Sequence, residues 1–450
     1  MKLFSHKITV LALLSAALLG VQAAASVSTP DRIEITAEFI DGLLAEAQGR
    51  SPMLQAADAR AEAAKSAVDS VRTWEDPTAT FGLWSPTSRG MPASQEGNLI
   101  YGLDQKLPLY GRPDLRRKVA ATDASRERFA ADYEAQKLRR DLLVALNNLA
   151  LASRQAEIAE QDLGWLDATL ANADHRYRVG QASQVDWLKI QIARATEGND
   201  LRTKERDREH SAFALNRLLN RDLHSPWPKV ALPSLQPPIY YTAQLVEAAL
   251  EAAPQLKIMR QESAAAQAAA DLTRRDRLPD VSVGLEARQY SGDGGLREST
   301  ATVSFSVPWL NHSRYGDDLR RDQQRKRARD FATEDYLLSV REELHHHVIA
   351  LDADRRQAVL YRDQLVPLTQ QAIASAQAAW ERNVGPFQDI LDAHRMLLTD
   401  ELGLAQPLTD QGMLLADLSF LTGSRDVGAL VALAGVPSPG HDGHNPDNSK

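Results

Sequence analysis

The sequence predicts a mixed, mainly α-helical fold in which long coiled-coil hairpins are joined to four short β-strands. Three observations lead to this fold class. Two halves of the chain match at an offset of about 200 residues, one long segment repeats small and apolar residues about every 3.5 positions, and short runs between the helices alternate with a period of two. The composition agrees, because 43% of the residues are hydrophobic but only 6% are aromatic, as in alanine-rich helical proteins.

The first residues have the pattern of a secretory signal peptide, which we assign to residues 1–25. Lys2 and Lys7 are basic, residues 8–21 are almost entirely apolar, and the alanines at 23–25 offer a small-residue cleavage site. The apolar run is shorter than the ~20 residues that a helix needs to span a membrane. No later segment is apolar enough for such a helix. The chain therefore reads as an exported protein.

Charge and cysteine content narrow the classes of function. The net charge of −8 gives no basic face for nucleic acid. The chain has no cysteine, so it lacks disulfides and must draw its stability from packing or oligomerisation. We also find no cysteine nucleophile, phosphate-binding glycine loop or His-Glu-x-x-His stretch. These absences favour a protein that is not an enzyme and has no cofactor.

The chain is organised as two tandem copies of one unit. Each copy opens with a helical run after a small residue and a proline, Ser51-Pro52 in the first and Ala253-Pro254 in the second. A proline-rich stretch separates the copies and is a natural linker. The predicted segments are a first repeat at 26–225, a linker at 226–252, a second repeat at 253–426 and a disordered tail at 427–450.

A strand hairpin follows the first helix of each repeat. In the second repeat, Val281, Val283, Leu285 and Ala287 alternate with mostly polar residues, and residues 301–307 do the same after a glycine-rich turn. This period of two predicts a hairpin with one apolar face. The corresponding runs of the first repeat, 78–84 and 98–107, are less regular. Taken alone, both hairpins also fit an ordinary soluble protein.

The longest helix is predicted at about residues 113–179. Its apolar seam consists of Leu142, Leu146, Leu149, Ser153, Ala156, Ala159, Leu163, Leu166, Leu170, Ala173 and Tyr177. A rise of ~1.5 Å per residue makes such a helix ~100 Å long. The second repeat echoes the end of this seam, but Pro367 should kink or break its helix there.

Each long helix ends in a predicted tight turn into a second helix. The first turn contains Arg178, Val179, Gly180 and Gln181, and the second contains Arg382, Asn383, Val384 and Gly385. An ungapped match puts Asn383 opposite Gly180, and both residue types tolerate the left-handed backbone that ends a helix. Ser183 and Pro386 then stand at the same place, where each suits the start of the next helix. A gapped match of Gly385 to Gly180 remains open.

This order of elements, present twice, resembles the TolC family of outer-membrane efflux proteins. The resemblance rests on the duplicated unit, the hairpin that ends in Leu-Pro-Leu-Tyr-Gly at 107–111, and the helical turn at 177–188. In length the chain is most similar to the CzcC-like heavy-metal efflux branch. The resemblance implies a homotrimer in which each chain gives four strands to one twelve-stranded β-barrel and its helices to a periplasmic tunnel. The implied location is the outer membrane, in contact with its lipid.

The resemblance also implies partners and site residues. A periplasmic adaptor would dock on the two turns, and an inner-membrane pump, of the RND type, would deliver substrate for passive exit, with heavy-metal cations favoured. Asp389 and Asp392 match the acidic residues of the family's gate. They lie three positions apart on one helix face, so a trimer would gather six carboxylates. The simpler interpretations are two solvated acids and ordinary turn residues.

Other interpretations of the chain stay open. His345, His346 and His347 suggest metal binding, but consecutive residues point ~100° apart around a helix, so solvated histidines are the favoured interpretation and no metal site is assigned. His441 and His444 lie in the predicted tail. A drug, solute or type I secretion duct would have the same fold. The alternative of another class is a soluble periplasmic scaffold or adaptor.

Overall fold

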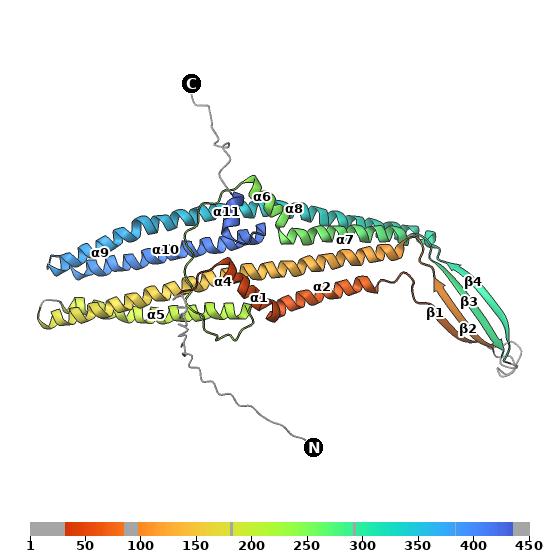
Figure 1. Cartoon of the computed structure of the whole chain (residues 1–450), viewed down its shortest axis with the longest axis horizontal. Helices are drawn as coiled ribbons and strands as arrows, with labels where there is room; N and C mark the ends of the chain where they lie inside the picture. The colour runs from red at the N-terminus through yellow and green to blue at the C-terminus, as the bar shows by residue number, and fades with distance from the viewer. Residues whose placement is uncertain (1–31, 85–97, 181–182, 291–293, 383, 435–450) are drawn as a thin grey trace, which may run out of the picture.

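A four-stranded sheet forms one end of an elongated molecule, and two helical hairpins form the other end (Figure 1). The computed structural model describes residues 32–84, 98–180, 183–290, 294–382 and 384–434. The signal peptide predicted at 1–25 and residues 435–450 of the predicted tail, with His441 and His444, lie outside these ranges. In the part of the chain that is described, no helix is both long and apolar enough to cross a membrane.

From Pro52 onward the helices of the first repeat follow the predicted order. They are α1 (Ala37–Arg50), α2 (Pro52–Ser70), α4 (Arg112–Arg178) and α5 (Gln184–Leu218), and α1 precedes the first predicted helix. Pro52 occupies the first turn of α2, where its missing N–H costs nothing because that group has no partner in the helix. The 67 residues of α4 run without a break and span ~100 Å, so the predicted long helix is confirmed.

The second repeat contains the same helices with additions. They are α6 (Ala243–Ala252), α7 (Pro254–Asp276), the 3-10 turn η1 (Pro308–Asn311), α8 (His312–Leu360), the π-helical turn η2 (Tyr361–Leu365), α9 (Val366–Glu381), α10 (Phe387–Thr422) and α11 (Val427–Ala434). The break expected at Pro367 is confirmed, since η2 lies just before it. Proline cannot donate to the carbonyl four residues earlier and clashes with it, which favours the wider turn.

Two predicted boundaries are wrong. Part of the predicted linker is helical, because Thr242 caps α6 by accepting a hydrogen bond from the backbone N–H of Leu245 at 3.1 Å. The first eight residues of the predicted disordered tail form α11. Its Leu430 is fully buried in the cluster that contains Leu245 and Leu418. The apolar octapeptide at the start of this segment therefore packs as a helix and is not part of a disordered tail.

The sheet joins the two repeats. Its strands β1 (Thr78–Trp84), β2 (Asn98–Lys106), β3 (Val281–Tyr290) and β4 (Leu296–Phe305) are antiparallel in the order β1-β2-β3-β4, as the two predicted hairpins require. The central pair unites the repeats, with Tyr101 opposite Ala287. β1 and β4 are the edges, and among the described residues neither has a partner on its outer side.

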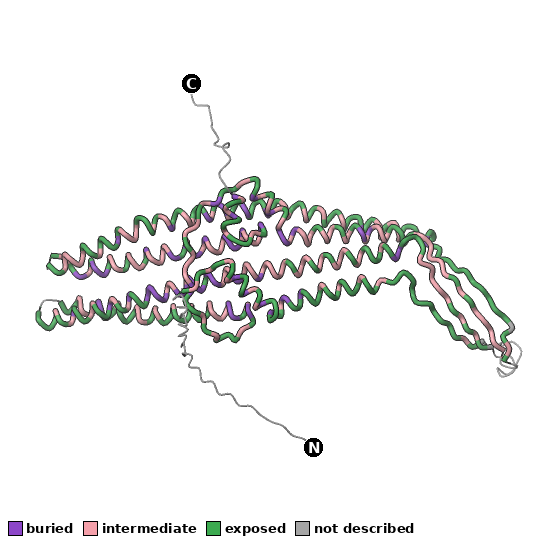
Figure 2. The backbone as a smooth tube through the Cα atoms, in the orientation of Figure 1, coloured by how far each residue is buried: buried purple, intermediate pink, exposed green. Residues whose placement is uncertain are grey.

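Alternation gives the sheet one apolar and one polar face. Phe81, Leu285 and Phe305 lie on the apolar face and are 78%, 61% and 61% exposed. Glu286 and Arg288 are on the other face, with Glu298 opposite Arg288. No strand residue whose exposure is described is buried, and Figure 2 shows the buried residues gathered in the helices. The sheet has no core of its own within one chain.

The helical part contains three core clusters. One lies among α1, α2, α4 and α5 around Leu142 and Leu146. A second lies among α6, α8, α10 and α11 around Leu344 and Leu418. The third lies near the hairpin ends and includes Leu166 and Phe387. The predicted seam of α4 is confirmed from Leu142 to Ala159, where all its positions are buried, whereas its last position, Tyr177, is exposed.

Candidate functional site

The first helical hairpin turns at residues 178–183. Arg178 is the last residue of α4, and Gly180 has φ of 74°, a conformation that glycine adopts without steric penalty. Ser183 starts α5, since its hydroxyl accepts a hydrogen bond from the backbone N–H of Asp186 at 3.1 Å. Val179, between these helices, is 54% exposed. The predicted turn is confirmed, while Gln181 lies outside the described residues.

The second hairpin turns at residues 382–386 by a different contact. The backbone N–H groups of Val384 and Gly385 both donate to the carbonyl of Ala379, at 3.0 and 3.2 Å. A Cβ on Gly385 would lie 3.0 Å from the Cβ of Ala379, so this glycine permits a close approach. Val384 is 77% exposed.

The starts of the helices after the two turns agree with the ungapped match. Pro386 is the N-cap of α10, as Ser183 is of α5. Arg382 caps α9. Asn383, which the match places opposite Gly180, lies outside the described residues.

The two turns are held side by side by aromatic contacts. The guanidinium carbon of Arg176 lies 3.9 Å from the ring centroid of Trp380, which links α4 to α9. Trp380 also meets Phe387 edge-on, with centroids 5.4 Å apart, and Phe387 is only 2% exposed. The predicted docking residues Arg178, Val179 and Val384 remain at the surface.

The predicted gate residues lie just beyond the second turn. Asp389 and Asp392 are exposed, whereas Ile390 and Leu391 between them are buried. Asp392 accepts a hydrogen bond from the amide of Gln388 at 2.8 Å. Asp389 lies in the first turn of α10, where the helix dipole favours a negative charge. One chain thus presents two surface carboxylates, and any convergence requires further copies.

The three consecutive histidines of α8 have separate surroundings. His345 meets the ring of Tyr241 edge-on at 5.3 Å, and a nitrogen of His347 lies 3.7 Å from Glu343. The rings of His346 and His347 are 5.9 Å apart. Among the residues that the structure describes, no three histidine, aspartate or glutamate side chains are arranged to hold a metal ion.

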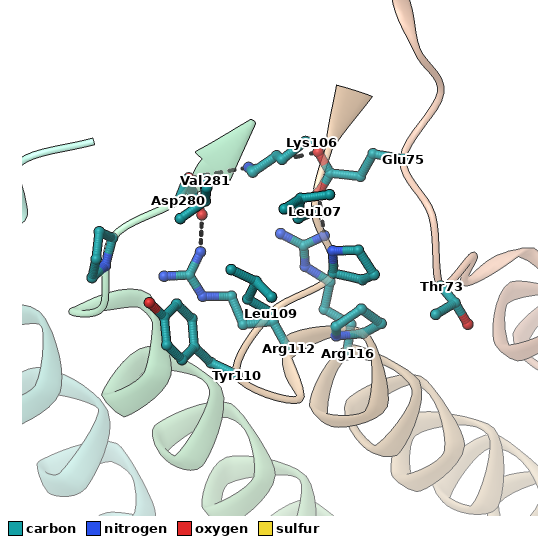
Figure 3. A pocket seen from close by; sticks show the side chains of 13 residues that line it. Thr73, Glu75, Lys106, Leu107, Leu109, Tyr110, Arg112, Arg116, Asp280 and Val281 are labelled. Carbon is teal, nitrogen blue, oxygen red and sulfur yellow. Dashed lines mark hydrogen bonds and ion pairs between the residues drawn. The ribbon is translucent and has the colours of Figure 1, made fainter. Parts of the chain in front are cut away.

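A cluster of charges joins the sheet to the helices (Figure 3). Tyr110 and Gly111 have φ of 61° and 68°, and this left-handed pair lets the chain turn from β2 into α4. Arg112 follows and is 8% exposed. Its guanidinium donates to the carbonyl of Arg275 at 3.0 Å and to the carboxylate of Asp280. Arg112 therefore clamps the first repeat to the point where the second enters the sheet.

The same cluster contains a more exposed part. Arg116 donates to Glu75 at 2.7 Å, and this hydrogen bond lowers the pKa of the Glu75 carboxyl. Lys106 lies 3.1 Å from Asp280 and 3.6 Å from Glu75. The charges thus connect α4, β2 and the segments that enter both hairpins. The sequence motif around Gly111 pointed to this turn, but nothing in it identified the partners.

A buried polar contact between the repeats was missed in the sequence. The Nε2 atom of His394 lies 2.6 Å from Oδ1 of Asp162, although Asp162 is only 5% exposed. The imidazole also stacks on Trp165 with centroids 3.7 Å apart. Asp162 is next to the seam position Leu163, and its neighbours in the sequence give no sign that it faces α10.

Comparison with known proteins identifies the family that has this architecture. Residues 43–221 and residues 245–424 each match the outer membrane efflux protein family. The chain belongs to the outer membrane efflux protein family. The first match lies within the first predicted repeat, and the second covers most of the second predicted repeat but begins inside the predicted linker. Channels of this family are transport proteins that act as trimers with adaptor and inner-membrane pump partners. No curated protein matches the chain.

Solved channel structures have the same fold. The outer membrane protein VceC from Vibrio cholerae aligns with a TM-score of 0.73 at 16% identity, over 86% of this chain and 96% of that chain. The outer-membrane channel OprN gives 0.74 at 17% identity over 86% and 90%. CusC gives 0.75 at 16% identity over 85% and 91%. The predicted combination of long helices and a four-stranded antiparallel sheet is confirmed.

Proposed function

We propose that this chain is the outer-membrane channel subunit of a tripartite efflux system. Three copies would form one channel, with helices that extend into the periplasm. A periplasmic adaptor would dock at the hairpin turns, and an inner-membrane pump, of the RND type, would deliver the substrate. The chain itself would be a passive exit duct and not an enzyme.

The sheet is the observation that carries this proposal. Its apolar face exposes large side chains such as Phe81, Leu285 and Phe305, and β1 and β4 are free edges within one chain. In water, such a patch and such edges favour aggregation. In lipid, the face is favourable, and pairing of β1 with β4 of the next copy removes every edge. A soluble periplasmic scaffold offers no comparable partner for this face.

The opposite face fits the interior of a trimeric, twelve-stranded barrel. Arg288 lies 3.3 Å from Glu298 and 3.9 Å from Glu286. A Cβ on Gly284 would lie 3.0 Å from a carboxylate oxygen of Asp104, so glycine leaves room for that acid. Charged groups of both signs would therefore line the water-filled side.

The hairpin end supplies the proposed gate and docking surface. In a trimer, three copies of Asp389 and Asp392 would bring six carboxylates together, and like charges at close range repel one another and attract cations. The exposed Val179 and Val384 are apolar contacts that an adaptor can cover. The two arginines of the turns, Arg178 and Arg382, are exposed beside them.

Heavy-metal cations are the substrate class that we favour, on the resemblance to the CzcC-like branch and the acidic gate. A strain that lacks this chain should accumulate divalent metal cations, and the wild-type chain should restore their export. If the wild-type chain restored export of a neutral drug but had no effect on metal cations, the channel would be reassigned to drug efflux.

Membrane fractionation tests the channel itself. At native expression, the chain should be recovered as a trimer in the outer membrane, and the purified trimer should conduct ions in planar bilayers. Recovery as a soluble periplasmic monomer would reject the channel in favour of the scaffold.

A further inference from the structure

The contact between Asp162 and His394 lies where the two helical hairpins meet. Asp162 belongs to α4 and His394 to α10, and their side chains are 5% and 12% exposed. The contact distance is 2.6 Å. Burial of a charge is costly unless the charge is paired, so the protonation of His394 decides whether Asp162 has a true counter-ion.

A third titratable group faces the same carboxylate from α5. Glu197 is hydrogen-bonded to Asp162. Burial is the largest cause that raises the pKa of Glu197 to about 7, and the negative charge of Asp162 adds to it, with a smaller effect from Asp200. Two carboxyl groups that share a hydrogen bond hold one proton more readily than two separate ones. This site therefore gathers three titratable side chains, one each from α4, α5 and α10.

We propose that Asp162, Glu197 and His394 form a proton-binding site that fastens the two helical hairpins at acidic pH and releases them at alkaline pH. In the protonated site, an imidazolium pairs with one carboxylate and the second carboxyl is neutral, so the net charge is zero. In the deprotonated site, two carboxylates face a neutral imidazole. That buried net charge of −2 favours separation of the helices.

The surrounding charges do not supply a substitute counter-ion in the described contacts. On α5, Arg194 pairs with Asp167, and on α10, Arg395 lies 3.7 Å from Asp392. Towards the middle of the molecule, Arg154 of α4 lies 2.9 Å from Glu401. Other polar contacts of these helices include those of Asp400 with Thr369 of α9, of Lys204 with Gln155 and of Lys189 of α5 with Gln388 of α10.

The position of the site along the second hairpin indicates what would follow when Asp162 and His394 separate. His394 lies between the second turn and Gly403, whose missing side chain leaves room for Tyr361. Tyr361 starts the π-helical turn, and α10 contains Pro407 one turn further. Both helices of the second hairpin are thus irregular at the same level, whereas α4 is continuous. Separation of His394 from Asp162 would let the distal part of the second hairpin bend at this level.

The regulatory part of this inference rests on the proposed channel function, whereas proton binding does not. The absence of cysteine allows one spin label on α5 and one on α10, through Thr196→Cys and Met396→Cys, both at exposed positions. Distances between the labels would be measured in purified full-length trimers with one labelled chain, from pH 5 to 9.

The hairpins should be close together at acidic pH and apart at alkaline pH, which gives a short and a long distance between the two labels. We expect the population with the long distance to grow as the pH rises, with the midpoint of the change near the pKa of Glu197. Between its two forms the site releases two protons, so the ratio of the two states changes by at most about a hundredfold per pH unit. Glu197→Gln, which keeps the hydrogen bond without the charge, should hold the short distance up to pH 9. The matched control Glu205→Gln alters an exposed residue of the same helix and should follow the wild type.

A distance distribution that ignores pH, or a Glu197→Gln variant that follows the wild-type profile, would overturn the proton-binding site. His394→Ala gives a second check, because loss of the direct contact with Asp162 should move the labels apart even at pH 5. Bilayer conductance separates the two proposals. A pH-dependent distance with pH-independent conductance would reject the regulatory role, and absence of current at every pH would reject the channel but not the site.

Discussion

The guanidinium of Arg176 lies over the ring of Trp380, and this pair joins the ends of the two repeats. Arg176 lies two residues before Arg178, where the first turn begins, and Trp380 lies two residues before Arg382, where the second begins. The pair therefore fixes the spacing of the two hairpin turns within one chain. Its contacts with Phe387 connect it to the core below.

Removal of Trp380 should loosen both turns. Trp380→Ala loses a cation–π contact and an aromatic contact, together worth roughly 1–2 kcal/mol. Hydrogen exchange should rise in the last turns of both α4 and α9. Trp187→Ala is the control, because Trp187 stacks only on Tyr177 of its own hairpin. If exchange rose in α9 alone, the two turns would be independent.

Arg112 should matter more than its neighbour Arg116. Arg112→Ala leaves buried carbonyls without a donor and should lower the free energy of unfolding by about 1–3 kcal/mol. Arg112→Lys should not restore it, since an ammonium cannot reproduce the planar array of donors. Arg116→Ala removes an exposed ion pair and should cost about 1 kcal/mol or less. Thermal unfolding of the trimer measures all three, and equal losses for Ala at both positions would contradict the assigned clamp.

Neutralisation of the proposed gate should make the channel easier to open. Asp389→Asn combined with Asp392→Asn removes six negative charges from a trimer, so repulsion and cation binding at the constriction both fall. We expect higher conductance in planar bilayers and weaker block by divalent cations. Asp335→Asn, at an exposed position of α8, is the matched control. Currents like those of the wild type would reject these residues as the gate.

Acid should weaken the attachment of α1. Arg221 of the segment after α5 contacts both oxygens of Glu46, at 2.8 and 2.5 Å, and this hydrogen bonding lowers the pKa of Glu46. A carboxyl with a lowered pKa stabilises the folded state above its unfolded pKa, and the stabilisation is lost as the pH falls through the folded pKa.

The wild type should therefore lose roughly 1 kcal/mol more than Glu46→Gln between neutral pH and about pH 3. Thermal midpoints at the two pH values give the comparison. Glu251→Gln, an exposed change on α6, should behave as the wild type does. A Glu46→Gln midpoint that falls as steeply as that of the wild type would show that the pair contributes nothing.

Local signals made most of the fold predictable. Helix starts at Pro52 and Pro254, the turn at Gly180 and the break at Pro367 depend on backbone preferences of single residues. The strands of the second repeat followed from an alternation that the sheet retains. In each case the residue whose type allowed the prediction is also the residue whose backbone forms the feature.

Contacts between distant segments were not predictable in this way. Arg112 and Asp280 are 168 residues apart, and Asp162 and His394 are 232 apart. Which residue of α10 meets α4 depends on the relative shift of two long helices, and no short motif encodes that shift. The helix α11 was not predicted because it packs on a core cluster to which the distant helices α6 and α8 contribute.

The unbroken course of α4 has a consequence for how such a chain can change in length. One continuous helix, α4, runs from the sheet to the hairpin end, so the number of its residues sets the distance between the two. Removal of seven residues would shorten the helix by ~10 Å while keeping its seam in phase. The helices that run alongside it, α5, α8, α9 and α10, would need deletions of the same length. Otherwise the two hairpin turns would no longer lie side by side. Insertions and deletions in these helices are therefore expected only in coordinated sets.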